Sequence, residues 1–268
     1  MLTTMLLCVL AVQGQDVDLI GTPPISSEVK ERLGQYLNTR SASLNSISTD
    51  GTRLLITTRF GETQQIHLVE QPLGKREQLT FGDEPLRSAS FLPGMEDQII
   101  FRSDKGGDEA YQLHRLDLND GRTELLTDGF SRHGNFRLSW DGTQIVYTSN
   151  ARNGRDMDIF VRALDYPTAY YVMEVDGHWE VIDWSRDGEM LLLRQYLSVA
   201  DTRAYFLDIS SGRLRELREG STPSFEGAMC FSQDGRNVFV ASDREGSFVR
   251  LYEVDRIEQD WIPHTEHL

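Results

Sequence analysis

The chain of 268 residues is long enough to bury a large core, and its 39% hydrophobic and 26% charged residues are ordinary for a folded globular protein. The formal net charge of −15 comes from 42 acidic against 27 basic residues, and Lys and Arg form no cluster along the chain. This balance excludes a largely disordered chain, and it argues against a nucleic-acid-binding protein, because phosphate backbones are bound by concentrated positive charge.

Residues 1–14 have features of a signal peptide that is cleaved on export. Residues 1–12 are mostly apolar, but this run is too short to span a bilayer and lacks the usual positive residues before it. We therefore expect a secreted or periplasmic protein with no membrane span. Cleavage would remove Cys8 and leave Cys230 alone, in an apolar context that predicts a core position and not a nucleophile.

Residues 15–42 are predicted to form a leader with one short helix. Pro23 and Pro24 forbid a helix at their own positions, and Ser27 is a suitable N-cap for one that ends near Asn38. Its apolar face would carry Val29, Leu33, Tyr36 and Leu37. We expect this face to pack against the rim of the domain that follows.

A turn of the form Ser-x-Asp-Gly recurs between pairs of short apolar segments. The aspartates step by 46 residues (187 − 141) and 47 residues (234 − 187), and the gap of 91 (141 − 50) is close to two periods, with Phe91 to Met95 at the missing position. A period of roughly 40–50 residues built from short strands is typical of a β-propeller with one four-stranded blade per repeat. The turn residues are Asp50, Gly51, Asp141, Gly142, Asp187, Gly188, Asp234 and Gly235.

The fold class predicted from this repeat is all-β, a propeller of about five four-stranded blades that is either complete or part of a larger propeller. The third repeat shows the plan, with strands expected over 136–140, 144–149, 157–162 and 170–175. Fourth strands close with a recurring Leu-Thr, as at Leu79-Thr80 and Leu126-Thr127. The predicted blades cover 43–82, 86–130, 135–177, 180–221 and 226–268, so the chain is expected to end at a blade boundary.

Candidate sites within the repeats have structural explanations. The turn aspartates lie in different blades, and each can bond its own backbone while the glycine takes a positive φ. The carboxylate-rich loops 103–109 and 150–158 lack the ligand pattern of a calcium site, and the six His residues lack zinc spacing. Trp140 and Trp184 suit packing between blades. We therefore predict no catalytic residue, no metal ligand and no cofactor.

The repeat resembles that of TolB-type propellers and of the propellers in prolyl-oligopeptidase-family serine peptidases. The motif is clearest in SWDGTQIVYTSNARNGRDMDIFVRAL, which begins at Ser139. Two further stretches, Tyr36 to Ala42 and SDKGGDEAYQLHRLDLNDG from Ser103, are similar to the N-terminal part of secreted aminoacyl- or dipeptidyl-peptidase-like members. The resemblance extends from Tyr36 to Leu268.

In the peptidase family this resemblance implies a propeller that caps a separate hydrolase domain, whose nucleophilic Ser lies in a Gly-x-Ser-x-Gly turn. No such motif occurs in this sequence. We therefore expect a non-catalytic propeller portion of a secreted serine peptidase, which gates or docks peptide substrates for a hydrolase half absent from this chain. The alternative is a stand-alone TolB-like module that binds a protein partner in the cell envelope. A five-bladed glycoside hydrolase would need convergent carboxylates in the channel, and none stand out.

Overall fold

A computed structural model describes residues 21, 23–218, 220 and 222–265. The predicted signal peptide over residues 1–14 and Cys8 lie outside the described residues. The chain divides into a unit that ends at Arg40 and a unit that begins at Ser41. Within the described residues, no helix is both long and apolar enough to cross a membrane.

The first unit contains helix α1, Ser27–Leu37. Its N-cap is Ser26, whose hydroxyl accepts from the Val29 amide over 3.3 Å, and not Ser27 as the sequence suggested. Ser26 holds the cap because its backbone is extended, with φ −62° and ψ 151°, while Ser27 is already helical. No residue of α1 is buried, and the packing of its apolar face against the domain that follows stays a prediction.

The described residues of the second unit form twenty strands joined by turns and loops. The first two blades contain β1 (Ser43–Ile47), β2 (Leu54–Thr58), β3 (Gln65–Val69), β4 (Glu77–Gln78), β5 (Ser88–Phe91), β6 (Gln98–Ser103), β7 (Gln112–Asp117) and β8 (Thr123–Leu125). The last three contain β9 (His133–Leu138), β10 (Gln144–Ser149), β11 (Asp158–Ala163), β12 (Ala169–Met173), β13 (His178–Trp184), β14 (Met190–Ser198), β15 (Asp201–Asp208), β16 (Leu214–Glu216), β17 (Glu226–Phe231), β18 (Asn237–Ser242), β19 (Arg250–Asp255) and β20 (Trp261–Pro263).

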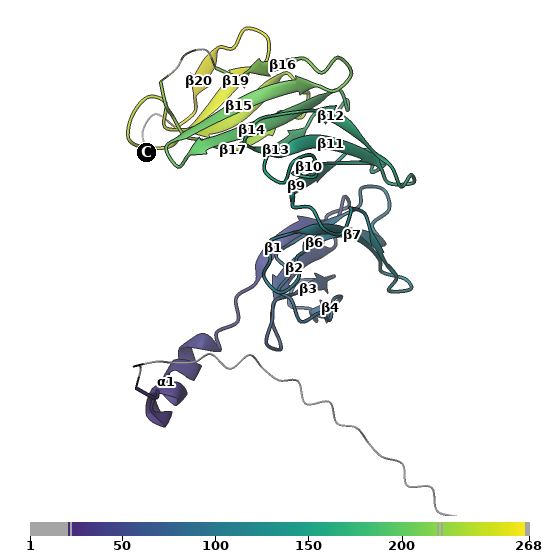
Figure 1. Ribbon diagram of the computed structural model, residues 1–268, viewed down its shortest axis with the longest axis vertical. Helices are drawn as coiled ribbons and strands as arrows, with labels where there is room; N and C mark the ends of the chain where they lie inside the picture. The colour runs from purple at the N-terminus through teal and green to yellow at the C-terminus, as the bar shows by residue number, and fades with distance from the viewer. Residues whose placement is uncertain (1–20, 22, 219, 221, 266–268) are drawn as a thin grey trace, which may run out of the picture. The chain divides into compact units, whose positions relative to one another are not determined.

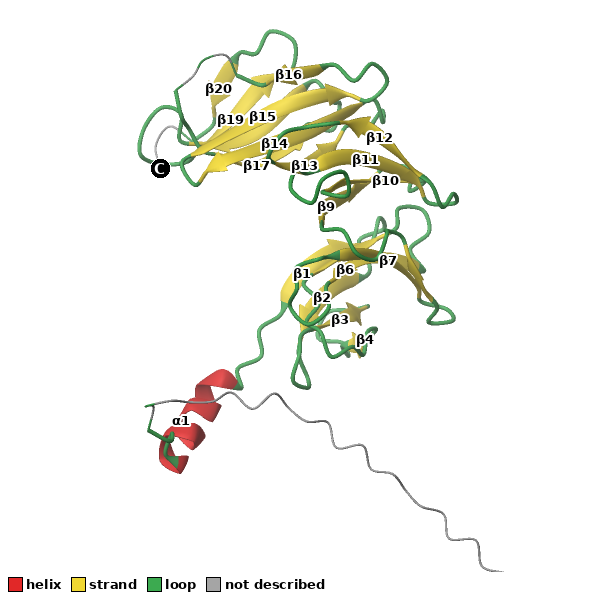
Figure 2. Cartoon of the chain, viewed as in Figure 1, coloured by secondary structure: helices red, strands yellow, loops and turns green. Residues whose placement is uncertain are grey.

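These strands form five antiparallel sheets of four strands, and each sheet uses strands that are consecutive in the sequence. Figure 1 shows the sheets following one another along the chain, and Figure 2 shows strands throughout the second unit. The all-β propeller fold of five four-stranded blades, with one short helix before it, is thereby confirmed for the described residues.

The Ser-x-Asp-Gly segments form the turns between the first and second strands of four blades. In the first blade, Ser48 Oγ donates to Asp50 Oδ1 over 2.6 Å and accepts from the Arg53 amide over 2.8 Å, while Asp50 Oδ1 accepts from the Thr52 amide. The same three contacts recur at Asp141, Asp187 and Asp234. The glycines have φ of 73°, 70°, 79° and 69°, where a side chain would be strained. The motif is thus a self-contained turn.

Threonine hydroxyls explain the recurring Leu-Thr at the fourth strands. Thr80 Oγ1 accepts from the Ile66 amide over 3.0 Å, and Thr127 Oγ1 accepts from the Leu113 amide over 3.1 Å. Thr265 makes the same contact with Leu251, and all three pairs are separated by 14 residues. Each hydroxyl extends the pairing of the third and fourth strands beyond the last backbone ladder bond.

Adjacent blades are joined by separate hydrophobic cores. Alternate residues of each second strand face opposite neighbours, so that Ile99 and Phe101 pack toward the first blade while Ile100 packs toward the third. Equivalent clusters join the third blade to the fourth and the fourth to the fifth. Trp184 is 2% exposed in the cluster between the third and fourth blades, as predicted.

Antiparallel pairing places the connections at two ends of the blades. We call one the turn end, which carries the Ser-x-Asp-Gly turns. The other, the loop end, carries the links between second and third strands and between successive blades, including 59–64, 79–87, 104–111, 126–132, 150–157, 199–200 and 243–249.

Cys230 is exposed, which corrects the prediction of a core position. Strand β17 alternates its side chains, and Met229 takes the position facing the fourth blade. Cys230 lies on the opposite face of the fifth blade, so its apolar sequence neighbours did not indicate its own burial.

Candidate functional site

The turn aspartates do not form a common site, since each is bound within its own turn in a different blade. Hydrogen bonds from Ser48 and Thr52 lower the pKa of Asp50 to about 2. The serine of the same turn is likewise the main cause that lowers the pKa of Asp141, Asp187 and Asp234. Carboxylates held in the ionised state by local donors are suited to fixing a turn and unsuited to general acid catalysis.

Three loop-end segments from the second and third blades converge. They are the β6–β7 loop (104–111), the β8–β9 connection (126–132) and the β10–β11 loop (150–157). The Arg132 amide donates to Asn150 Oδ1 over 2.8 Å, and the Asn150 amide donates back to the Arg132 carbonyl over 3.1 Å. Gln112 Nε2 also donates to the Ser131 carbonyl over 2.7 Å. The central connection is therefore tied to the β10–β11 loop on one side and to the first residue of β7 on the other.

A cavity of about 460 Å³, which we call the loop cavity, opens among these segments. Its lining includes Asp108 and Glu109 from one carboxylate-rich loop, Asn150 and Gly154 from the other, and Phe130, which is 77% exposed. The structure thus brings together the two acidic loops that the sequence treated separately.

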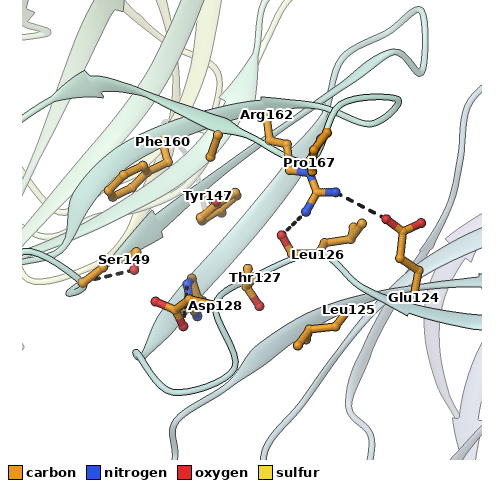
Figure 3. Close-up of a pocket in the computed structure, with 13 residues that line it drawn as sticks. Glu124, Leu125, Leu126, Thr127, Asp128, Tyr147, Ser149, Phe160, Arg162 and Pro167 are labelled. Atoms are coloured by element: carbon orange, nitrogen blue, oxygen red, sulfur yellow. Dashed lines mark hydrogen bonds and ion pairs between the residues drawn. The ribbon is translucent and has the colours of Figure 1, made fainter.

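A second cavity of about 390 Å³ lies between the second and third blades, and we call it the inter-blade pocket. Figure 3 shows the rings of Tyr147 and Phe160 at one side of it. Their centroids are 5.9 Å apart and the rings are stacked, with Leu125 and Pro167 among the other lining residues. Ala151 lines both this pocket and the loop cavity, so the two cavities adjoin. Together they form the candidate site.

Polar groups line part of the inter-blade pocket. Asp128 Oδ1 accepts from the amides of Phe130 and Ser131 and lies 3.9 Å from His133 Nε2. Burial lowers the pKa of His133, although the Asp128 charge acts in the opposite direction, so the imidazole is neutral near pH 7. Burial acts to raise the pKa of Asp128, but its hydrogen bonds outweigh this and lower it. The pocket therefore contains the carboxylate of Asp128 beside the neutral imidazole of His133, which has one donor and one acceptor nitrogen.

Arg162 closes the pocket on the far side from Asp128 and is 4% exposed. It donates to the Leu126 carbonyl and to the Tyr166 carbonyl, and its Nη2 lies 3.4 Å from Glu124 Oε1. These contacts join the second blade to the third. Because its hydrogen-bonding groups are used in this way, Arg162 is a structural cation and not a free anion site.

A similar cavity lies between the first and second blades, but its chemistry differs. Leu86 and Phe101 in this cavity stand at the positions of the repeat that correspond to His133 and Tyr147 in the next blade. Leu116 likewise corresponds to Arg162. The inter-blade pocket is thus the version of a repeated groove in which apolar residues are replaced by polar ones. Aligning the repeats with one another reveals this difference, and our sequence reading, which treated His133 only as one of six scattered histidines, missed it.

The acidic residues at the end of the β10–β11 loop and the start of β11 are engaged in structural bonds. Asp158 is paired with Arg152 over 2.8 Å and accepts from the Val175 amide, and Asp156 accepts from the Gly177 amide over 2.8 Å. No group of three or more His, Cys, Asp or Glu side chains able to hold a metal ion occurs in the part of the chain that the structure describes. Trp140 is 58% exposed, and its Nε1 donates to the Trp184 carbonyl in the next blade.

The blades and their order place the protein among the β-propellers. Its fold is similar to TolB from Acinetobacter baumannii, with a TM-score of 0.63 and 19% identity over 84% of this chain and 54% of that chain. It is also similar to oligogalacturonate lyase in complex with manganese (TM-score 0.66, 14% identity, 82% of this chain and 63% of that chain) and to a prolyl endopeptidase (0.66, 15%, 84% and 36%). No protein-family model and no curated protein matches the sequence. At these identities the likeness shows the fold, and the chain spans only about half to two thirds of TolB and the lyase.

Proposed function

We propose that this propeller is a non-catalytic docking module that holds peptide segments at its loop end. The observation that carries the proposal is the candidate site itself, an aromatic-lined pocket that adjoins a loop cavity beside the exposed Phe130. Concave apolar pockets with a few placed polar groups are the usual form of ligand sites, and exposed aromatic side chains are common anchors of protein interfaces.

The charge of the site favours one kind of peptide. Asp108, Glu109, Glu124 and Asp128 lie around the two cavities and outnumber the two cations there, of which Arg132 is 4.0 Å from Glu109 and Arg162 is already occupied. A peptide segment with an apolar or aromatic side chain next to a basic group or a free amino terminus would therefore match the site. The apolar side chain suits the inter-blade pocket, and the positive charge suits the acidic residues around the two cavities.

The larger role that we propose is the gating or docking of peptides for a serine peptidase, in a secreted or periplasmic setting. Support comes from the apolar N-terminal sequence, from the peptidase-like leader and from the likeness of the fold to a prolyl endopeptidase propeller. A stand-alone module that binds an envelope protein is the second candidate, and it is favoured by the likeness to TolB.

Panning a random peptide display library against the purified protein tests the docking function. We expect enriched peptides with an aromatic or aliphatic anchor, and roughly tenfold weaker binding in Phe130→Ala, because truncation of a central interface residue commonly costs more than 1 kcal/mol. Ala151→Trp, which fills the junction of the two cavities, should weaken the same peptides.

Ile257→Ala is the matched control, because Ile257 is 73% exposed at the turn end. Peptides that bind all variants equally, or that lose affinity only in Ile257→Ala, would contradict the proposed site. A parallel assay with aminoacyl and dipeptidyl amide substrates should show no turnover, and turnover blocked by a fluorophosphonate would overturn the non-catalytic assignment.

A further inference from the structure

A separate cavity of about 320 Å³ lies along the first strands of the first three blades, and we call it the inner groove. Strand β1 contributes Asn45, β5 contributes Ser88 and Ser90, and β9 contributes Asn135 and Arg137. The three remaining lining residues are Ala89, Phe136 and Leu138, so Arg137 is the only ionisable side chain among the residues that line this groove.

Arg137 is a half-buried cation without a close counter-ion. Its Nε donates to the Ile182 carbonyl over 2.5 Å and its Nη1 donates to the Phe136 carbonyl over 2.8 Å. Within the described residues, Nη2 has no hydrogen-bond partner and no carboxylate oxygen lies within 4.0 Å of the guanidinium. One edge of the guanidinium is thus held by the backbone, while Nη2 remains available to a ligand.

The nearest acidic groups are committed elsewhere. Asp183 accepts from the amides of Trp184 and Phe231, both over 2.8 Å, and Glu180 is bound by Arg194. Burial lowers the pKa of Arg137, and the charges of Asp183 and Glu180 partly oppose this effect. Because the pKa of arginine is far above neutral pH, the guanidinium remains charged.

Two uncharged donors accompany Arg137 in the groove. Arg102 Nη1 donates to Asn135 Oδ1 over 3.3 Å, and this contact fixes the amide so that Asn135 Nδ2 is left as a donor without a partner among the described residues. Ser88 Oγ is likewise unbonded within the described part of the chain. One cation with two uncharged donors beside it, and no acidic side chain in the lining, matches the two acceptor oxygens of a carboxylate.

We propose that the inner groove binds a carboxylate presented by an extended peptide, either its C-terminal carboxylate or an Asp or Glu side chain, with Arg137 as the main contact. The proposal rests on the proposed function for the choice of a peptide as the ligand. It deepens that function, because the two sites would bind groups of opposite charge. The acidic loop end would bind a basic group of the peptide and the inner groove would bind its carboxylate, so that the two sites together would set the direction of a bound peptide.

A peptide suits the groove better than an acidic sugar. The groove is bordered by extended strands, and Phe136 is the only aromatic residue in its lining and is 7% exposed, so no ring face is open for a sugar to stack on. The overall charge of −15 repels anions in general, so binding of a carboxylate here requires the local cation.

Fluorescence anisotropy with rhodamine-labelled penta-alanine peptides tests the proposal. The three probes are the peptide with a free C-terminal carboxylate, the same peptide amidated, and an amidated peptide with one central aspartate. We expect at least one carboxylate probe to bind roughly tenfold or more tightly than the neutral amide, since hydrogen bonds to charged groups contribute about 1.5–3 kcal/mol. The stronger of the two carboxylate probes identifies the source.

Variants locate the contact. Arg137→Met should remove the preference for the carboxylate, Arg137→Lys should keep part of it, and Ser88→Ala should weaken it without changing the charge. Arg213→Met is the matched control, because Arg213 is exposed in the fourth blade and its side chain makes no hydrogen bond or ion pair within the described residues. Thermal melts of each variant show whether the fold is retained, and Ser88→Ala keeps the test valid if Arg137→Met does not fold.

Equal binding of all three probes would overturn the proposal, as would an equal loss in Arg213→Met and Arg137→Met, which would indicate long-range attraction only. Tighter binding of a galacturonate trimer than of any peptide would overturn the assignment to peptides. A carboxylate preference that depends on Arg137, found together with panned peptides whose binding does not depend on Phe130, would leave the inner groove supported and the loop-end site contradicted, so the two proposals fail separately.

Discussion

Glu226 is a carboxyl group with 0% exposure between the fourth and fifth blades. Its Oε2 accepts from the Ala204 amide over 2.6 Å, and its Oε1 lies 2.6 Å from Arg218 Nε. Arg218 stands 14 residues after Ala204 (218 − 204), the spacing at which other blades have the threonine. A carboxyl group and a guanidinium from two chain segments therefore take the place of one hydroxyl in the fourth blade.

The free energy of unfolding should change with pH as the carboxyl group of Glu226 titrates. Burial raises the pKa of Glu226 to about 7, more than Arg218 and the Ala204 amide lower it. Because the folded state holds the proton more tightly than the unfolded state, this contribution to stability is complete below about pH 4.5 and is lost as the pH rises toward 7. The loss corresponds to roughly 3 kcal/mol.

Glu226→Gln should flatten this part of the profile, because the neutral amide does not titrate. Urea unfolding midpoints between pH 4.5 and 8 measure the effect, and Glu189→Gln, at an exposed position, is the control. A profile of Glu226→Gln with the slope of the wild type would show that another group is responsible.

At the scale of the element, the threonine contacts predict a cost for removing one hydroxyl. Thr127→Val keeps the shape of the side chain but leaves the Leu113 amide without its acceptor, and Leu113 is 0% exposed. We expect a loss of about 1–3 kcal/mol in the free energy of unfolding, as for an unsatisfied buried donor. Thr123→Val, at an exposed position on β8, should cost much less in the same urea titration. Equal losses in the free energy of unfolding for Thr127→Val and Thr123→Val would contradict a special stabilising role of the Thr127 hydroxyl.

The strands were predictable to different degrees. The predicted second strand of the third blade, 144–149, coincides with β10 because turn residues bound the segment on both sides. In the fourth blade, β14 continues to Ser198 and β15 begins at Asp201, so these two strands are longer than those expected in the third repeat. Only residues 199–200 separate them, and this tight link contains no Gly, Pro or Asn to mark it.

The candidate site was less predictable than the blades. Asp128, Tyr147 and Phe160 come from three segments that are brought together only by blade packing, and nothing in the sequence near each residue indicates a pocket. The aromatic stacking of Tyr147 on Phe160 has a counterpart in Phe101 and His114 of the preceding blade, so it is detectable only when the repeats are compared. Sequence patterns report strands, whereas the cavity depends on the contact between sheets.

At the scale of the whole second unit, each hydrophobic core joins only neighbouring blades, so damage to one should remain local. Leu192, with 0% exposure, lies in the core between the fourth and fifth blades. Leu192→Ala should cost about 2–5 kcal/mol through the cavity that it leaves.

Hydrogen exchange followed by mass spectrometry measures how far this damage extends. We expect faster exchange in β13 to β20 and unchanged exchange in β1 to β8, because the first two blades share no core with Leu192. Leu73→Ala, at a fully exposed position, should leave all blades unchanged. Uniform acceleration across all five blades in Leu192→Ala would instead show a single cooperative unit.

Every sheet is built from four strands that follow one another in the chain, and this order has a consequence for synthesis. A blade has all of its strands as soon as its own residues have emerged from a ribosome or a translocation pore, because it needs none from a distant part of the polypeptide. Short loops between partners also make such pairing fast. The protein can therefore acquire its structure progressively from the amino terminus, with each completed blade offering an apolar surface on which the next one forms.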